Sequence, residues 1–104
     1  MSIAIPEIIL NDGNRIPAVG FGTYKLKGND GVHAIESAIN HGYRLLDSAY
    51  NYENEGTVGE AIRRTSVPRD QLLITSKLPG RYHTYQDAVT TIQESLYHAN
   101  LDYY

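Results

Sequence analysis

The chain has 104 residues, of which 41% are hydrophobic and 20% are charged, a composition that is typical of one folded domain and unlike that of a disordered chain. The formal net charge is -3 and the Lys and Arg residues are scattered, so neither nucleic acid nor an anionic membrane is expected as a partner. No cysteine is present, which excludes disulfides and thiolate catalysis, and the sequence shows neither a secretion signal nor the roughly 20 apolar residues of a spanning helix, so we expect a cytoplasmic protein.

The first predicted element is a β-hairpin over residues 5–17. Asn11, Asp12 and Gly13 separate its two short apolar segments, and these residue types tolerate the positive φ of a tight turn. Residues 19–22 then predict a short buried strand, which a polar loop follows.

The first helix is predicted over residues 32–40, where apolar side chains recur at helical spacing. Asn29 or Asp30 can cap its start, and Gly42 stands where a left-handed residue commonly ends a helix. A strand is expected next, over Tyr43–Asp47.

Asn54 is expected to cap the second helix, which ends before Pro68. Its apolar face comprises Val58, Ala61 and Ile62. A strand over Leu72–Lys77 follows, and Thr84 is expected to cap the third helix. The apolar stripe of that helix comprises Ala88, Ile92, Leu96 and Ala99.

Another strand is predicted to start near Tyr103. Strands therefore alternate with helices at a spacing of about 30 residues, which is the size of a βαβ unit and predicts a parallel sheet. No linker or change in composition divides the chain, so residues 1–104 are expected to form one domain.

Three polar residues are predicted to meet at one edge of this sheet. Asp47 and Lys77 close consecutive strands, and Tyr52 lies in the loop after Asp47. Active sites of parallel α/β folds are built at the carboxyl ends of the strands. Taken singly, each residue is more often an exposed or packing residue; their joint placement suggests a site.

The sequence resembles the aldo-keto reductase family. Residues 42–49 read Gly-Tyr-Arg-Leu-Leu-Asp-Ser-Ala, and with Glu55 and the Val-Gly pair at 58–59 they match the signature of that family. Residues 20–24 and 73–77 are also similar to family segments, in the same order and at similar spacing. The resemblance implies an α/β fold, with the N-terminal hairpin, the first three βα units and the start of strand four of a (β/α)8 TIM barrel. Because such a barrel takes about 250 residues, this one would be incomplete and its sheet could not close.

The resemblance implies hydride transfer from NADPH, with NADH as the alternative, to an aldehyde or ketone substrate. Tyr52 would be the proton donor, with Lys77 and Asp47 supporting it. The family's catalytic histidine would follow a strand that begins near Tyr103, and none of His33, His41, His83 and His98 matches that position. A non-catalytic binding or structural protein on the same scaffold is the alternative.

The resemblance also implies that Gly22, Thr23, Tyr24 and Asp47 lie near the nicotinamide; the simpler interpretation of residues 22–24 is a tight turn. A dinucleotide-fold motif is not supported, since the third glycine of GxGxxG is missing. The residues expected to line the substrate pocket are Tyr24, Tyr50 and Tyr52. For Tyr50 and Tyr82, simple packing between neighbouring loops explains the sequence as well as a place in the pocket does.

Further expectations follow from the composition and from the open sheet. No pair of residues shows metal-ligand spacing, so no metal is expected. A chain with unpaired strand edges is expected to self-associate, and without the rest of the barrel it should be inactive and bind NADPH weakly.

Pro79 and Gly80 follow Lys77-Leu78 where many relatives place a tryptophan, which leaves the substrate preference open.

Overall fold

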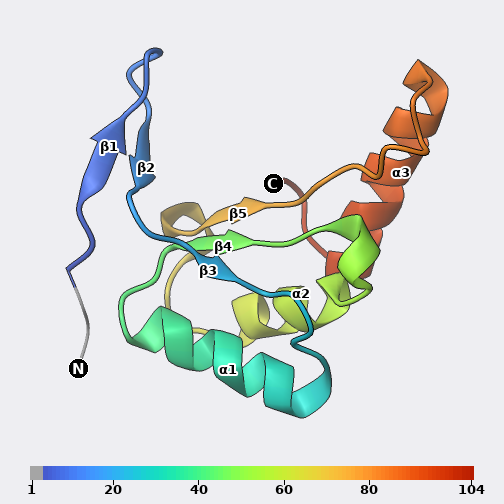
Figure 1. Ribbon diagram of the computed structural model, residues 1–104. Coiled ribbons are helices and arrows are strands. Elements are labelled where there is room, and N and C mark those ends of the chain that lie inside the picture. Colours follow the sequence, from blue (N-terminus) through green and yellow to red (C-terminus); the bar gives the residue numbers. More distant parts are fainter. Residues whose placement is uncertain (1–3) are drawn as a thin grey trace.

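The strands form two separate sheets, and two helices cover one face of the larger sheet (Figure 1). This computed structural model describes residues 4–104. In chain order the elements are β1 (Glu7–Ile9), β2 (Arg15–Pro17), β3 (Phe21–Gly22), α1 (Gly28–Asn40), β4 (Leu45–Asp47), the 3-10 turn η1 (Tyr50–Tyr52), α2 (Glu55–Arg64), the 3-10 turn η2 (Arg69–Gln71), β5 (Leu73–Thr75) and α3 (Tyr85–Ala99).

The predicted hairpin is confirmed. β1 and β2 pair antiparallel with Ile8 opposite Ile16. Gly13 has a φ of +88°, and the Asp12 carboxylate accepts hydrogen bonds from the backbone and side-chain nitrogens of Asn14. Figure 1 shows the hairpin projecting away from the helices, and Ile8 is accordingly 53% exposed.

The parallel sheet is also confirmed, in the order β3-β4-β5. Leu46 stands opposite Phe21 on one side and Ile74 on the other. The strands are shorter than predicted, and residues 19–22 do not form a buried strand: Val19 is 51% exposed and Gly22 is also exposed. The reason is that β3 lies at the edge of the sheet, with β4 as its partner in the ladder.

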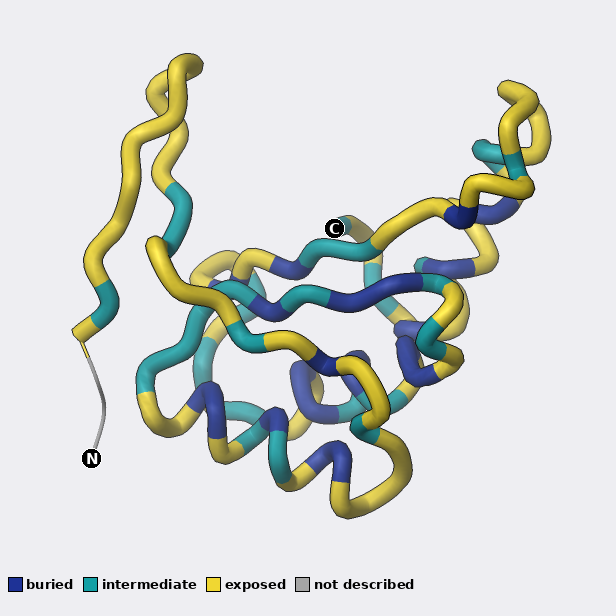
Figure 2. Tube along the Cα trace, viewed as in Figure 1, coloured by how far each residue is buried: buried dark blue, intermediate teal, exposed yellow. Residues whose placement is uncertain are grey.

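The core lies between the sheet and helices α1 and α2. Leu46 is fully buried and Ile74 is 1% exposed. Figure 2 shows that the buried stretches of the two helices lie on the side that faces the sheet. The buried hydrophobic cluster comprises Val32, Ile35, Ile39, Leu46, Val58, Ala61, Ile62, Leu72 and Ile74. The apolar faces predicted for the first two helices are therefore correct.

The starts of these two helices differ from the prediction. α1 begins at Gly28 with Lys27 at the N-cap, so Asn29 and Asp30 lie inside the helix. Asn54 does occupy the N-cap position of α2, but its side chain makes no capping hydrogen bond. Its amide instead reaches the loop after β3, as described below. Gly42 follows α1 with a φ of +113°, as expected for a residue that ends a helix.

Helix α3 begins as predicted, since the Thr84 hydroxyl accepts a hydrogen bond from the backbone N–H of Asp87. Its buried residues are Thr91, Ser95 and Ala99. The predicted stripe is correct at Ala99 but wrong at Ile92, which is 48% exposed. Figure 1 gives the reason: only the C-terminal part of α3 packs near α2, and the N-terminal part extends away from the sheet. Residues 101–104 form no strand in this structure.

None of the helices in the described part of the chain is both long and apolar enough to cross a membrane.

Candidate active site

The ends of β4 and β5 bring Asp47 and Lys77 together. Asp47 is the last residue of β4, and Lys77 lies two residues past the end of β5. The Lys77 ammonium is 2.8 Å from Oδ2 of Asp47, and the Thr75 hydroxyl donates to Oδ1 at 2.6 Å. Both carboxylate oxygens therefore accept a hydrogen bond, which fixes the direction of the Asp47 side chain.

Lys77 also contacts Tyr52. Its Nζ lies 3.4 Å from the Tyr52 hydroxyl oxygen, 5.2 Å from the centre of the Tyr52 ring, and donates to the backbone carbonyl of Ser48 at 2.9 Å. The ammonium thus lies within reach of a carboxylate, a carbonyl and a phenol. The three residues predicted to meet are brought together at the carboxyl edge of the sheet.

Asp47 and Lys77 each stabilise the charged form of the other. Partial burial raises the pKa of Asp47, but hydrogen bonds from Lys77 and Thr75 and the lysine charge outweigh it, so the net pKa lies below its usual value of 3.8. Partial burial lowers the pKa of Lys77, but the hydrogen bonds to Asp47 and Tyr52 outweigh it, so the net pKa lies above 10.5. At neutral pH the pair is an ammonium and a carboxylate.

Tyr52 is held by a short turn that the sequence did not predict. Residues 50–52 form the 3-10 turn η1, and the N–H of Tyr52 donates to the carbonyl of Ala49. Glu53 then takes a left-handed conformation with a φ of +57°. The Tyr52 ring packs against Tyr24, with ring centres 5.0 Å apart. Tyr24 and Tyr52, both expected at a substrate pocket, thus lie side by side.

The loop after β3 is fixed to the end of β4. The Thr23 N–H and hydroxyl both donate to the carbonyl of Asp47, at 3.1 and 2.9 Å, and Thr23 is fully buried. Tyr24 is 63% exposed, and a Cβ added at Gly22 would meet no atom within 4 Å. Thr23 therefore joins two strand ends, while Gly22 and Tyr24 border open space.

Tyr50 lies toward α3 rather than with the other two tyrosines. Its ring centre is 6.1 Å from that of Tyr82 and 5.7 Å from that of His98. It borders a cavity of about 320 Å³, whose other lining residues include Lys77, Ile92, Ser95 and Tyr104. The tyrosines predicted at the pocket thus lie on two sides of the carboxyl edge of the sheet (the rim), with Tyr24 and Tyr52 on one side and Tyr50 on the other.

Sequence reasoning missed two buried residues next to Tyr52. Asn54 and Glu55 are each 3% exposed and contact other loops of the rim. The sequence predicts Asn54 only as a helix cap and Glu55 only as part of the family signature. The sequence around them gives no signal of their burial, because Glu53 and Thr57 beside them are also polar.

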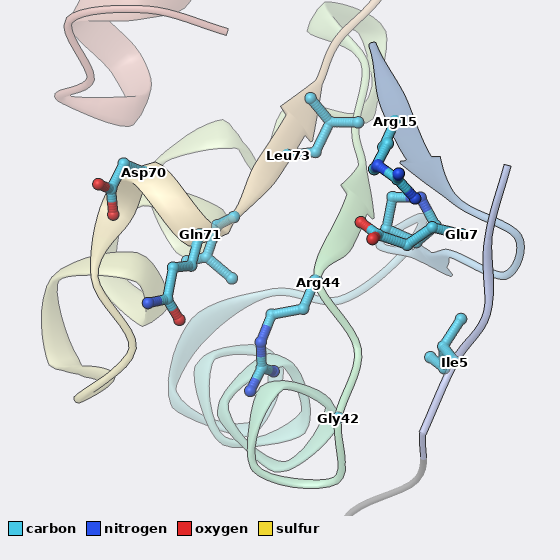
Figure 3. Close-up of a pocket in the computed structure, with 10 residues that line it drawn as sticks. Ile5, Glu7, Arg15, Gly42, Arg44, Asp70, Gln71 and Leu73 are labelled. Carbon is cyan, nitrogen blue, oxygen red and sulfur yellow. The ribbon is translucent and has the colours of Figure 1, made fainter. Parts of the chain in front are cut away.

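A second cavity, of about 510 Å³, lies at the opposite end of the sheet (Figure 3). It is bordered by the hairpin, through Glu7 and Arg15, and by the segments before β4 and β5. Figure 3 shows Arg44 directed toward α1, where its guanidinium donates to the carbonyl of Ile39 at 2.8 Å. This cavity is at the amino ends of the strands, where parallel α/β folds place stability rather than chemistry.

Comparison with known proteins identifies the family. The sequence profile of the Aldo/keto reductase family matches residues 18–104. The chain belongs to this family. An aldo/keto reductase from Brucella melitensis has a crystal structure that superposes with a TM-score of 0.89 at 34% identity, over 96% of this chain and 39% of the other. The fold is therefore part of the aldo/keto reductase barrel, and the prediction of an incomplete (β/α)8 barrel is confirmed.

One further relative is named for its activity, and another has a crystal structure in complex with NADP. The 2,5-diketo-D-gluconic acid reductase B of a Corynebacterium strain is 53% identical over 98 residues, which cover 94% of this chain and 35% of the relative. A Bombyx mori aldo-keto reductase in complex with NADP superposes with a TM-score of 0.84 at 39% identity, over 98% of this chain and 36% of the other. This aldo/keto reductase chain thus spans about a third of the length of the relatives it matches.

Proposed function

We propose that the protein reduces an aldehyde or a ketone to an alcohol with NADPH or NADH, and that Tyr52 donates the proton. The observation that carries the proposal is the position of the Lys77 ammonium, 2.8 Å from the Asp47 carboxylate and 3.4 Å from the Tyr52 hydroxyl. A nicotinamide held at this edge would supply a hydride to the carbonyl carbon and would itself be oxidised. The Tyr52 O–H bond breaks as its proton passes to the carbonyl oxygen, and solvent later returns a proton to the phenolate.

Lys77 and Asp47 assist this transfer electrostatically. The phenolate left on Tyr52 carries a negative charge, and an ammonium at hydrogen-bond distance stabilises it. Asp47 keeps the ammonium charged and directed, which agrees with the raised pKa of Lys77. A positioned proton donor typically accelerates such a reaction by about 10² to 10⁴.

The same rim is proposed to hold the nicotinamide and the substrate. Gly22, Thr23, Tyr24 and Asp47 are assigned to the cofactor, and Tyr24, Tyr50 and Tyr52 to the substrate pocket. Two observations support a fit: the space beside Gly22 is open, and the Asp47 and Lys77 side chains are 44% and 53% exposed. The NADP complex of the Bombyx mori relative and the reductase activity named for the Corynebacterium relative support the choice of cofactor and reaction.

Residues 1–104 taken alone are proposed to be one partial, cytoplasmic domain with little activity and weak NADPH binding. β3 and β5 each have one paired neighbour in the sheet. Unpaired strand edges and an uncovered sheet face favour association of copies. Sedimentation of this chain should therefore show oligomers, and a monodisperse monomer that binds NADPH in the micromolar range by calorimetry would contradict both parts.

A Tyr52→Phe substitution in the full-length protein tests the function. Carbonyl reduction, followed by loss of NADPH absorbance, is expected to fall by about 10² to 10⁴ because the proton donor is removed. The matched control is Tyr97→Phe, since Tyr97 lies on α3 and is 70% exposed. Unchanged turnover in Tyr52→Phe would remove Tyr52 from the role of proton donor. If the unsubstituted protein showed no turnover, a non-catalytic binding or structural protein would be favoured.

A further inference from the structure

Two buried polar residues, two and three positions after Tyr52, are not used by the proposed reaction. Asn54 and Glu55 begin helix α2, and each is 3% exposed. Burying an amide and a carboxylate costs free energy unless their hydrogen bonds compensate. Their partners therefore indicate what the pair does.

We propose that Asn54 and Glu55 are positioning residues that hold Tyr52 between the loop after β3 and the segment after β5. This inference rests on the proposed function, because Tyr52 is assigned there as the proton donor. Neither residue touches the reacting atoms. Each acts by fixing the segment in which a reacting or ligand-binding residue lies.

Asn54 ties the Tyr52 segment to the loop after β3. Its side-chain amide donates to the carbonyl of Thr23 at 2.6 Å and to the carbonyl of Leu26 at 2.9 Å. Tyr24 lies between these two carbonyls in the chain and packs on the Tyr52 ring. One amide group therefore sets the distance between the proposed cofactor loop and the proposed proton donor.

Glu55 ties the same segment to the residues that follow β5. Its Oε2 accepts hydrogen bonds from the hydroxyls of Ser76 at 2.8 Å and Tyr104 at 2.9 Å, and from the hydroxyl of Ser95. Ser76 is the residue before Lys77. Hydrogen bonds to a charged acceptor are stronger than those between neutral groups, so this carboxylate holds the Lys77 segment firmly against α2.

The buried oxygen atoms that accept no hydrogen bond show that neither Asn54 nor Glu55 is a simple helix cap. A capping Asn accepts a hydrogen bond through its oxygen, yet Oδ1 of Asn54 is buried without a partner. Oε1 of Glu55 is also buried without a hydrogen bond, with Nδ1 of His98 at 3.7 Å. The hydrogen bonds that are made all lead to other segments: the loop after β3, the residue after β5, helix α3 and residue 104.

Asn54→Asp tests the first tie with little change in shape. It replaces two donors by a carboxylate oxygen that faces the carbonyls of Thr23 and Leu26, so these groups repel one another. The loop after β3 should shift, and in the full-length protein the KM for the nicotinamide should rise about 10- to 100-fold, since a displacement of about 1 Å can cost 10²-fold. Asn54→Ala, which removes the donors without adding charge, replaces it if Asn54→Asp does not fold.

Glu55→Ala and Glu55→Gln test the second tie. Glu55→Ala removes the acceptor of three hydroxyls, and kcat should fall about 10- to 100-fold because Lys77 loses its position. Glu55→Gln retains an acceptor oxygen and should recover most of kcat. Equal losses in both variants would show that the charge and not the position matters, and would contradict the proposal. Glu53→Gln, at an exposed neighbouring position, is the matched control.

A readout that does not need turnover separates this inference from the proposed function. In the full-length protein studied by NMR, contacts between the Tyr24 and Tyr52 rings should give cross-peaks that Asn54→Asp weakens or abolishes and Glu53→Gln retains. If the unsubstituted protein shows no carbonyl reduction but the cross-peaks behave in this way, the positioning holds and the reaction fails. Cross-peaks and kinetics that are both unchanged in Asn54→Asp and Glu55→Ala would overturn the positioning itself.

Discussion

The two faces of the parallel sheet differ in burial, although the same three strands build both. Toward the helices, Leu46 and Ile74 are at most 1% exposed and lie inside the hydrophobic cluster. On the opposite face, Leu73 is 38% exposed, and at the end of that face the Asp47 side chain is 44% exposed and bound to Lys77. Because side chains alternate along a strand, one residue step separates the helix-covered face from the face on which the proposed site lies.

This division has a physical consequence for substitutions. Free energy of folding comes mainly from apolar area removed from water, which the helix-covered face provides. Exposed ion pairs contribute little to stability. Changes on the covered face should therefore alter the free energy of unfolding, and changes at the rim should alter reaction and binding while leaving stability almost constant.

The largest expected effect on stability is from Leu46→Ala. Leu46 is fully buried between the sheet and the helices, so the substitution leaves a cavity and should lower the free energy of unfolding by about 2–5 kcal/mol. Urea denaturation followed by circular dichroism measures this. The control is Leu45→Ala on the open face of β4, where Leu45 is only partly buried and the loss should be less than half as large. Equal losses would show that the two faces are not divided in this way.

Gly59→Ala should have the next largest effect. α2 approaches the end of α3 so closely that a Cβ at Gly59 would lie 1.8 Å from the carbonyl oxygen of Ala99. The helices must move apart, at a cost of about 1–3 kcal/mol. Gly56→Ala on the same helix is the matched control: its Cβ would meet the carbonyl of His98 at 3.4 Å, an ordinary contact, and alanine favours the helix by about 1 kcal/mol over glycine. Thermal unfolding should therefore move in opposite directions for the two variants.

Lys77→Met should change stability by only about 0–1 kcal/mol, because both partners of the ion pair are substantially exposed. The contribution of the Asp47–Lys77 pair to the free energy of unfolding depends on pH, and its direction follows from the two pKa shifts. The pKa of Asp47 is lowered in the folded protein, so its part is present above pH 3.8 and is lost as the pH falls below it. The pKa of Lys77 is raised, so its part is present below pH 10.5 and is lost as the pH rises above it.

The measurement is the difference in free energy of unfolding between the unsubstituted chain and Lys77→Met across this range. A constant small difference at intermediate pH, vanishing toward both extremes, is expected. A difference of several kcal/mol at neutral pH would mean that the rim is a stabilising region, and the comparison of the two faces would fail.

The sequence predicted the fold well where the pattern of side chains is local. The predicted strand ends placed Asp47 and Lys77 at one edge of the sheet, and helical spacing identified the buried faces of α1 and α2. The turn residues of the hairpin and the Thr84 cap depend on neighbours a few positions away, and both are as predicted.

The errors arise where long-range packing decides. Asn54 has the residue type and position of a helix cap, but the backbone carbonyls of Thr23 and Leu26 lie within reach of its amide. Ile92 fits the apolar stripe of α3, but that part of the helix extends beyond the sheet and leaves it exposed. Tyr50 and Tyr52 are two residues apart, yet the turn η1 directs one toward α3 and the other toward Tyr24. No local pattern contains this information.

The smallest expected effect is spectroscopic and concerns Tyr104, one of nine tyrosines. Burial of its hydroxyl, and the hydrogen bond to the Glu55 carboxylate, raise its pKa to about 12, against the lowering effect of Ser95. The folded chain therefore keeps a proton between pH 10 and 12 that the unfolded chain loses, so this group's contribution to stability declines as the pH rises through that interval. Subtracting the phenolate absorbance of Tyr104→Phe from that of the unsubstituted chain should leave one titration step centred near pH 12. A step centred near pH 10 would show that the Tyr104 hydroxyl is in contact with water, which would remove one of the three donors that hold Glu55.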